Sequence, residues 1–129
     1  MIVLVKKNPV QSVRGNEIVA KYLQLLDLHI DELRKGISEG SLEIQDFADR
    51  LHIHPRHLSN TLHQVTGKSP CDLFEERLIL VSKELLLKTN QQIGSIAEQL
   101  HYDPSNFTKF FKNYTGMTPK QFRQSEKQF

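Results

Sequence analysis

The chain of 129 residues has one cysteine, no tryptophan and a net charge of only +2. The single cysteine excludes an internal disulfide bond and is typical of a reducing compartment. No apolar run is long enough to cross a membrane. The apolar opening at residues 1–5 is too short for a signal peptide and is followed, not preceded, by lysines. We therefore expect a cytoplasmic protein of a prokaryote.

The sequence also lacks the usual signatures of a catalytic or metal site. It has no glycine-rich phosphate loop and no paired catalytic carboxylates. Four histidines lie between residues 52 and 63, but His54 and His57 straddle an expected helix start, and no nearby cysteine or carboxylate has metal-ligand spacing. Cys71 has no histidine or asparagine partner, so we expect a half-buried thiol. An enzyme using Cys71 or the histidines is the least favoured function. We predict no cofactor, no metal and no catalytic residue.

Helical spacing of apolar residues dominates the rest of the chain, and no alternating strand pattern competes with it after the first residues. Four of the five prolines stand at expected helix starts. The sequence therefore predicts an all-α fold of about seven helices. Their expected ranges are 16–35 with Asn16 as the cap, a short helix from Ser41 to Leu51, then 55–65, 69–89, 92–100, 104–114 and a last helix opened by a capping box at residues 118–121.

The longest uninterrupted helix is expected at residues 69–89. Ser69 is a suitable N-cap, Pro70 fits the first turn, and Asp72 places its charge at the positive end of the helix dipole. Glu84 and Lys88 form a favourable pair at spacing i,i+4. The expected apolar face consists of Phe74, Leu78, Val81 and Leu85, widened by Leu73, Leu80 and Leu87.

The segments on either side of this helix repeat each other at an offset of 49 residues. The matches include Pro55 with Pro104 and Gly67 with Gly116, which mark special backbone positions. The other matched pairs are Ile44/Ile93, Ala48/Ala97, Leu51/Leu100, His52/His101, Leu58/Phe107, Leu62/Phe111, Val65/Tyr114, Thr66/Thr115 and Pro70/Pro119. The chain therefore contains one supersecondary unit twice.

Each copy consists of a helix, a short turn and a second helix, which is the helix-turn-helix arrangement. The apolar positions of the second helices are expected to face the core: Leu58, Leu62 and Val65 in the first, Phe107, Phe111 and Tyr114 in the second, with Phe110 partly exposed. The polar positions face outward and include no Asp or Glu: Arg56, His57, Ser59, Asn60, His63 and Gln64, then Ser105, Asn106, Thr108, Lys109, Lys112 and Asn113. Such groups donate to phosphates or contact base edges.

At this point the chain resembles the DNA-binding region of AraC/XylS-type transcription regulators. The resemblance covers about residues 41–123 and is most specific at DPSNFTKFFKNYTGMTPKQFR. It implies two helix-turn-helix lobes joined by a rigid helix, which insert their recognition helices into successive major grooves. His52 and His101 stand where the family usually has glycine, so we expect a positive φ at both. The expected parts are a flexible lead-in (1–15), a first helix with the first lobe (16–68), the linker helix (69–89), and the second lobe with a C-terminal helix (90–129).

The leading hypothesis is a sequence-specific DNA-binding transcription regulator whose partner is double-stranded DNA, bound by a monomer. RNA polymerase is a second partner to consider, and the alternative function is a helical protein-interaction module that contacts the transcription machinery. The chain could act alone or be the DNA-binding part of a larger regulator. Arg56, Asn60 and Lys109 are the candidates for base contacts, and Lys112 is the candidate for a phosphate contact. The other candidate DNA-binding residues are His57, Ser59, His63, Ser105, Asn106 and Thr108.

Overall fold

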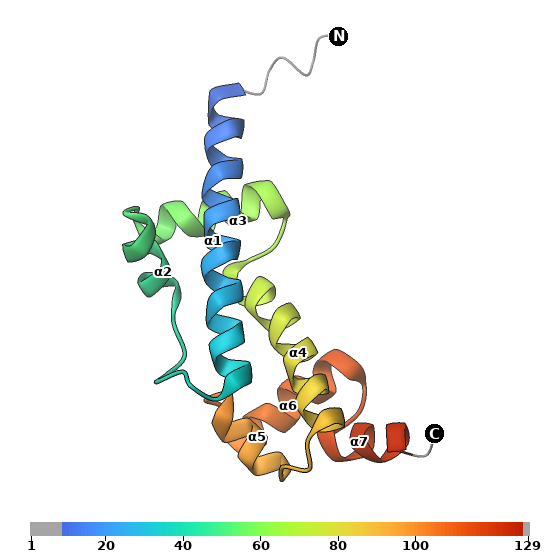
Figure 1. Cartoon of the computed structure of the whole chain (residues 1–129). Helices are drawn as coiled ribbons and strands as arrows, with labels where there is room; N and C mark the ends of the chain where they lie inside the picture. Colours follow the sequence, from blue (N-terminus) through green and yellow to red (C-terminus); the bar gives the residue numbers. More distant parts are fainter. Residues whose placement is uncertain (1–8, 128–129) are drawn as a thin grey trace. The chain divides into compact units, whose positions relative to one another are not determined.

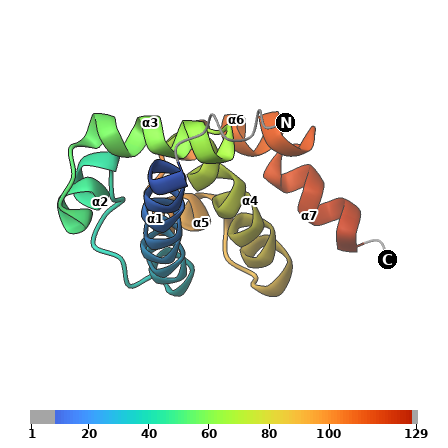
Figure 2. The ribbon, with the colours of Figure 1, turned by 90° about the horizontal axis from the view of Figure 1, so that it is seen from above.

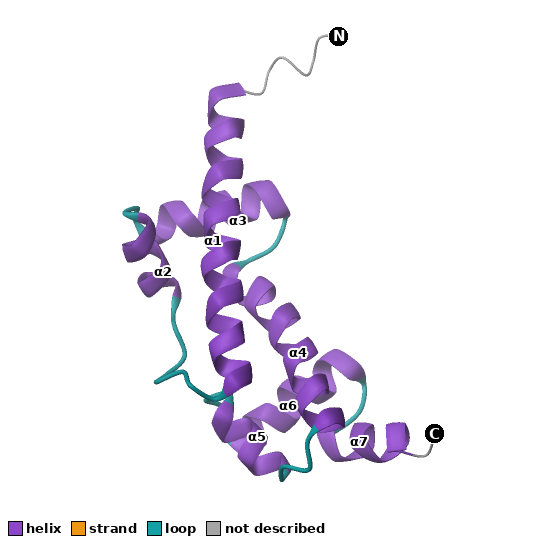
Figure 3. Cartoon of the chain, in the orientation of Figure 1, coloured by secondary structure: helices purple, strands orange, loops and turns teal. Residues whose placement is uncertain are grey.

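The computed structural model describes residues 9–127, and within them every regular element is a helix (Figures 1 and 3). This confirms the all-α prediction. The helices are α1 Pro9–Lys35, α2 Ile44–Leu51, α3 Pro55–Thr66, α4 Pro70–Lys88, α5 Ile93–Gln99, α6 Pro104–Thr115 and α7 Pro119–Lys127. None of these helices combines the length and apolar composition that a membrane span requires.

Five of the seven helices in the described residues begin at a proline. Proline suits this position because its φ is already helical and its missing N–H would have no partner in the first turn. Reciprocal side-chain bonds support two of these starts. Ser69 and Asp72 accept each other's backbone N–H at 3.0 and 3.1 Å. Thr118 and Gln121 do the same at 3.0 and 3.1 Å. The predicted caps of α4 and α7 are thus confirmed.

Two predicted helix starts are wrong. Helix α1 begins at Pro9 and not after Asn16, because it already has a packing partner before that residue: a Cβ at Gly15 would lie 3.4 Å from the Val65 side chain of α3. Helix α2 begins at Ile44 and not after Ser41. Glu43 has an extended backbone and its N–H donates to the Asp46 carboxylate at 2.8 Å, which makes it the N-cap. Residues 1–8 of the predicted lead-in lie outside the described residues.

The chain forms two compact units, and helices α1 and α4 each contribute to both. Unit 1 consists of Met1–Leu28 and Leu42–Phe74, and unit 2 of His29–Ser41 and Glu75–Phe129. In unit 1, α2 packs beside α3 (Figure 2), and the rings of Tyr22 and Phe47 meet edge to face with centroids 5.2 Å apart. The buried apolar side chains of unit 1 are Val19, Tyr22, Leu26, Phe47, Ala48, Leu58, Leu62 and Leu73.

Unit 2 has a more aromatic core, in which α6 packs against both α5 and α7. Phe111 contacts Phe122 of α7 with ring centroids 5.3 Å apart, and Tyr102 contacts Phe110 at 5.4 Å. Phe110 is only 7% exposed, so the prediction that it is partly exposed is wrong. The buried apolar side chains of unit 2 are Ile30, Leu33, Leu78, Ile79, Val81, Leu85, Leu86, Ile96, Ala97, Leu100, Phe107, Phe110 and Phe111.

Helix α4 is continuous over Pro70–Lys88, as predicted. Its predicted core residues Leu78, Val81 and Leu85 are buried, but Leu80 and Leu87 are 64% and 45% exposed. With about 100° per residue, both of these leucines lie opposite the buried residues. The buried face is instead widened by neighbours such as Ile79 and Leu86, together with Ser82, whose hydroxyl donates to the Leu78 carbonyl at 2.8 Å.

Arg123 of α7 closes the C-terminal end of α4. Its guanidinium donates to the carbonyls of Leu86 at 2.9 Å, Gln91 at 2.7 Å and Thr89 at 3.4 Å. The last carbonyls of a helix have no partner within the helix, so one planar side chain here supplies donors that the backbone lacks. Arg123 was part of the sequence resemblance, but its spacing gave no indication of this contact.

Candidate nucleic-acid interface

In unit 1 the helix-turn-helix consists of α2, a turn at residues 52–54, and α3. His52 ends α2 with φ 60° and ψ 38°, the left-handed conformation predicted for it. The next N–H, of Ile53, donates back to the Ala48 carbonyl at 3.1 Å. His54 then starts α3: its backbone is extended and its Nδ1 accepts the Arg56 N–H at 3.0 Å. The turn therefore reverses the chain with its backbone groups bonded on both sides.

In unit 2 the second copy repeats this geometry between α5 and α6. His101 has φ 60°, which confirms the second half of the prediction, and the Tyr102 N–H donates to the Ala97 carbonyl at 2.8 Å. Asp103 takes the place of His54 as the N-cap. Its carboxylate accepts from the Ser105 hydroxyl at 2.6 Å and from the backbone N–H groups of Ser105 and Asn106 at 3.1 and 3.3 Å. These bonds, first the one from the Ser105 side chain, lower the pKa of Asp103.

The outward face of α3 is polar and contains no carboxylate. Arg56, His57, Asn60 and His63 are exposed, as predicted, together with Gln64, while Ser59 is half-buried. Val65 was predicted to face the core but is 42% exposed. It lies in the last turn, where the helix extends past the buried Leu58 and Leu62.

The outward face of α6 has a different character from that of α3. Asn106, Lys109 and Lys112 are exposed, together with Asn113. Two other predicted residues have their hydroxyl groups engaged locally: Ser105 donates to Asp103, and Thr108, which is half-buried, donates to the Pro104 carbonyl at 3.1 Å. The positive charges therefore stand in the middle and at the end of α6, while its start carries the Asp103 carboxylate. By contrast, the first turn of α3 carries the positively charged Arg56.

Tyr114, the second copy's equivalent of Val65, was also predicted to face the core but is 42% exposed. Its ring contacts Phe110 with centroids 5.3 Å apart, and its hydroxyl donates to Glu75 at 3.2 Å. An aromatic ring with a polar end can cover the core and still reach solvent. The end of α6 is thus fixed to α4 by a side chain that is neither core nor candidate DNA contact.

Two side-chain contacts that position the second helix-turn-helix were not predicted. The Gln99 amide of α5 donates to the carbonyls of Leu33 at 3.2 Å and Arg34 at 2.8 Å, at the C-terminal end of α1, and accepts from Gln91 at 3.0 Å. The His101 ring contacts the Ser38 carbonyl through Nε2 at 3.0 Å. Both contacts lie within unit 2 and hold its first helix and turn to the segment that follows α1. A family pattern with glycine at position 101 could not reveal the histidine contact.

The histidines and Cys71, considered above as candidates for a metal or catalytic site, do not form one in the described structure. Within the part of the chain that the structure describes, no three His, Cys, Asp or Glu side chains are placed to hold a metal ion together. Cys71 is exposed, so the prediction of a half-buried thiol is wrong. It stands in the first turn of α4, directly after Pro70.

Comparison with known proteins agrees with this geometry. A family model described as a helix-turn-helix domain matches residues 47–125. Over 81 residues the chain is 35% identical to YisR, an uncharacterized HTH-type transcriptional regulator of Bacillus subtilis (strain 168), covering 62% of this chain and 28% of YisR. Over 103 residues it is 30% identical to AdaA of the same organism, named as a bifunctional transcriptional activator and DNA repair enzyme, covering 79% of this chain and 48% of AdaA. The chain thus spans less than half the length of either relative.

A solved structure shows the same fold at similar identity. The C-terminal domain of AraT, a response regulator from Geobacillus stearothermophilus, aligns with a TM-score of 0.65 and 30% identity, covering 78% of this chain and 84% of that one. The family match agrees with the two helix-turn-helix units and with the helix α4 that contributes to both. The chain belongs to the AraC-type family of helix-turn-helix domains.

Proposed function

We propose that this chain binds double-stranded DNA with sequence preference, as the DNA-binding part of a transcription regulator. One observation carries the proposal. The chain contains the helix-turn-helix twice, and neither recognition helix, α3 or α6, has an Asp or Glu at any position. Apart from the Asp103 cap before α6, these polar faces carry no carboxylate, which limits repulsion from phosphates and offers donors to base edges. The relatives are named as transcription regulators, so the protein-interaction alternative gains no support from them.

The proposed contacts follow from position on each helix. Arg56 stands in the first turn of α3, where recognition helices reach base edges, and Asn60 lies one turn further on the same face. Lys109 is the equivalent of Asn60 on α6, and Lys112, in the last turn of that helix, is the proposed phosphate contact. The other proposed DNA contacts are His57, Ser59, His63, Asn106, Ser105 and Thr108. The hydroxyl groups of Ser105 and Thr108 already donate within the helix start, so their oxygens remain available as acceptors.

A chain with two unlike recognition helices does not need a second copy to read an extended site. We propose that a monomer places α3 and α6 in successive major grooves, about one duplex turn or ~34 Å apart. The preferred site would then be asymmetric and not a palindrome. RNA polymerase is the proposed protein partner, and the nucleoid in the cytoplasm the proposed location. No catalytic activity is proposed.

Selection of bound sequences from random duplex DNA tests the proposal most directly. The expected result is an enriched asymmetric site with two conserved blocks. Fluorescence anisotropy on the enriched and on a scrambled duplex, at several salt concentrations, then measures affinity. Binding should weaken steeply with salt on both duplexes, because phosphate contacts release counterions. The absence of any enriched sequence, together with salt-independent binding, would reject sequence-specific recognition.

A further inference from the structure

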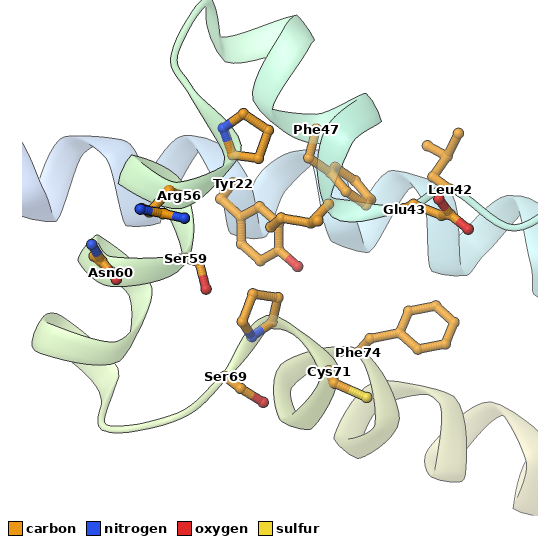
Figure 4. Close-up of a pocket in the computed structure, with 13 residues that line it drawn as sticks. Tyr22, Leu42, Glu43, Phe47, Arg56, Ser59, Asn60, Ser69, Cys71 and Phe74 are labelled. Carbon is orange, nitrogen blue, oxygen red and sulfur yellow. The ribbon is translucent and has the colours of Figure 1, made fainter.

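Unit 1 contains a cavity of about 610 Å³ bordered by α1, α2, α3 and the first turn of α4 (Figure 4). Every residue that lines it belongs to unit 1. Its aromatic wall is formed by Tyr22, Phe47 and Phe74. Tyr22 and Phe47 are buried and pack edge to face, so this part of the wall is held in place by the core. The volume falls within the ~300–1,000 Å³ typical of small-molecule sites.

Polar groups gather at one end of this cavity. Arg56, Ser59 and Asn60 of α3 lie together in Figure 4, on the other side of Tyr22 from Glu43. The Arg56 side chain is exposed and makes no ion pair with any residue of the described chain. An apolar cavity with an available guanidinium at its rim complements a ligand with a ring system and one anionic group.

We propose that this cavity binds a small aromatic acid, a planar ring system that carries one carboxylate or sulfonate. The rings lie against Tyr22, Phe47 and Phe74, and the acid group pairs with Arg56. Because Arg56 and Asn60 are also the proposed base contacts of α3, the bound acid competes with DNA for the same side chains. This last step rests on the proposed function, whereas binding of the acid does not. By linkage, DNA must then weaken binding of the acid by the same factor.

The test uses the whole 129-residue chain and 8-anilinonaphthalene-1-sulfonate as the probe. Isothermal titration calorimetry should show one saturable site. The Cys71→Trp variant places a large ring at the exposed rim of the cavity, and we expect it to weaken probe binding by roughly tenfold or more. Arg56→Ala should weaken it by roughly tenfold through loss of a charged hydrogen bond. The matched control, Asn90→Trp, adds the same ring at an exposed loop position of unit 2 and should leave binding unchanged.

A second measurement does not depend on the folding of any cavity variant. Cys71 is the only cysteine and lines the cavity, so bound probe should slow its alkylation by iodoacetamide. A chain with Cys71→Ser and Asn90→Cys should show no such protection. Probe binding that is unaffected by Cys71→Trp and leaves the alkylation rate of Cys71 unchanged would overturn the proposed site.

The effect on DNA is measured separately. On an enriched duplex, the probe should raise the apparent Kd of the unmodified chain but not that of Cys71→Trp. If the probe binds at one site while the Kd for DNA stays constant, the proposed competition between the acid and DNA is rejected. If the chain binds no duplex, the proposed function fails, and the calorimetric and alkylation results still decide whether the cavity takes an aromatic acid.

Discussion

The Arg123 guanidinium donates to the Gln91 carbonyl at 2.7 Å, and so ties α7 to the loop between α4 and α5. The same side chain bonds the carbonyls of Leu86 and Thr89. Arg123→Ala leaves these half-buried acceptors without a donor, and we expect it to lower the free energy of unfolding by roughly 1–3 kcal/mol. The free energy of unfolding of Arg123→Lys should lie between those of the unmodified chain and Arg123→Ala, because an ammonium group lacks the planar fork of the guanidinium. Urea denaturation measures the change, and Lys120→Ala on the exposed face of α7 is the control. Equal effects of Arg123→Ala and Lys120→Ala would contradict the capping role.

His52 and His101 share φ 60° but differ in their side-chain contacts. Replacing either with glycine removes the cost of a left-handed backbone, which stabilises by up to ~1 kcal/mol. His101→Gly also loses the contact of Nε2 with the Ser38 carbonyl at 3.0 Å, worth roughly 0.5–1.5 kcal/mol. We therefore expect His52→Gly to stabilise the chain more than His101→Gly does. Thermal unfolding of both variants measures the difference, and identical shifts would mean that the Ser38 contact contributes nothing. His52→Val and His101→Val should both destabilise.

The Asp103 cap makes the start of α6 sensitive to acid. Its pKa is lowered in the folded chain by hydrogen bonds, first from the Ser105 side chain and then from the Asn106 N–H. A lowered pKa means that the folded state favours the carboxylate. The stabilisation is therefore present above the unfolded pKa of ~4 and is lost as the pH falls through the folded value. Asp103→Asn keeps a good capping residue without the titration, so its melting temperature should fall less between pH 5 and 2 (about the range of this titration) than that of the unmodified chain. Parallel curves would exclude this contribution.

Arg56 and Lys112 should have separable effects on DNA binding. Arg56→Ala removes a proposed base contact, and we expect a loss of ~1–3 kcal/mol on the preferred site with relaxed preference in one block of it. Lys112→Ala removes a proposed phosphate contact, which should weaken all duplexes similarly and reduce the salt slope by about one unit. Anisotropy titrations on preferred and scrambled duplexes measure both. Lys21→Ala removes one charge from an exposed position on α1 and serves as the control. Equal, salt-independent effects of Arg56→Ala and Lys112→Ala would favour a protein-interaction role.

Much of the fold was predictable because its determinants are local. Prolines and caps predicted most of the helix starts, and the resemblance to a family with glycine at the matched positions predicted the left-handed backbone at His52 and His101. The errors arose where burial depends on distant neighbours. Leu80 and Leu87 have the seven-residue spacing of Leu73, yet they lie opposite the buried face of α4. A repeat spacing alone therefore did not identify the buried side.

The positioning contacts of the candidate site were not predictable for a different reason. Gln99 and Arg123 bond to main-chain carbonyls more than thirty positions away. Every residue has a main-chain carbonyl, so the residue types in the sequence do not indicate which one accepts the bond. Periodicity detects apolar faces but does not show which polar side chain donates to the last carbonyls of which helix. For the same reason the outward residues of α3 and α6 could be chosen from the sequence, while the local bonds of Ser105 and Thr108 could not.

The cap of α3 fixes the tautomer of His54. Its Nδ1 accepts the Arg56 N–H at 3.0 Å, so the neutral ring must carry its single proton on Nε2. The free end of the ring is therefore a donor, able to bind a phosphate oxygen or the acceptors of guanine but not a base amino group. At the equivalent place before α6, the Asp103 carboxylate can only accept. The two copies of one duplicated unit thus differ in hydrogen-bonding character at the same structural position: the His54 ring has a donor at Nε2, whereas the Asp103 carboxylate has only acceptors.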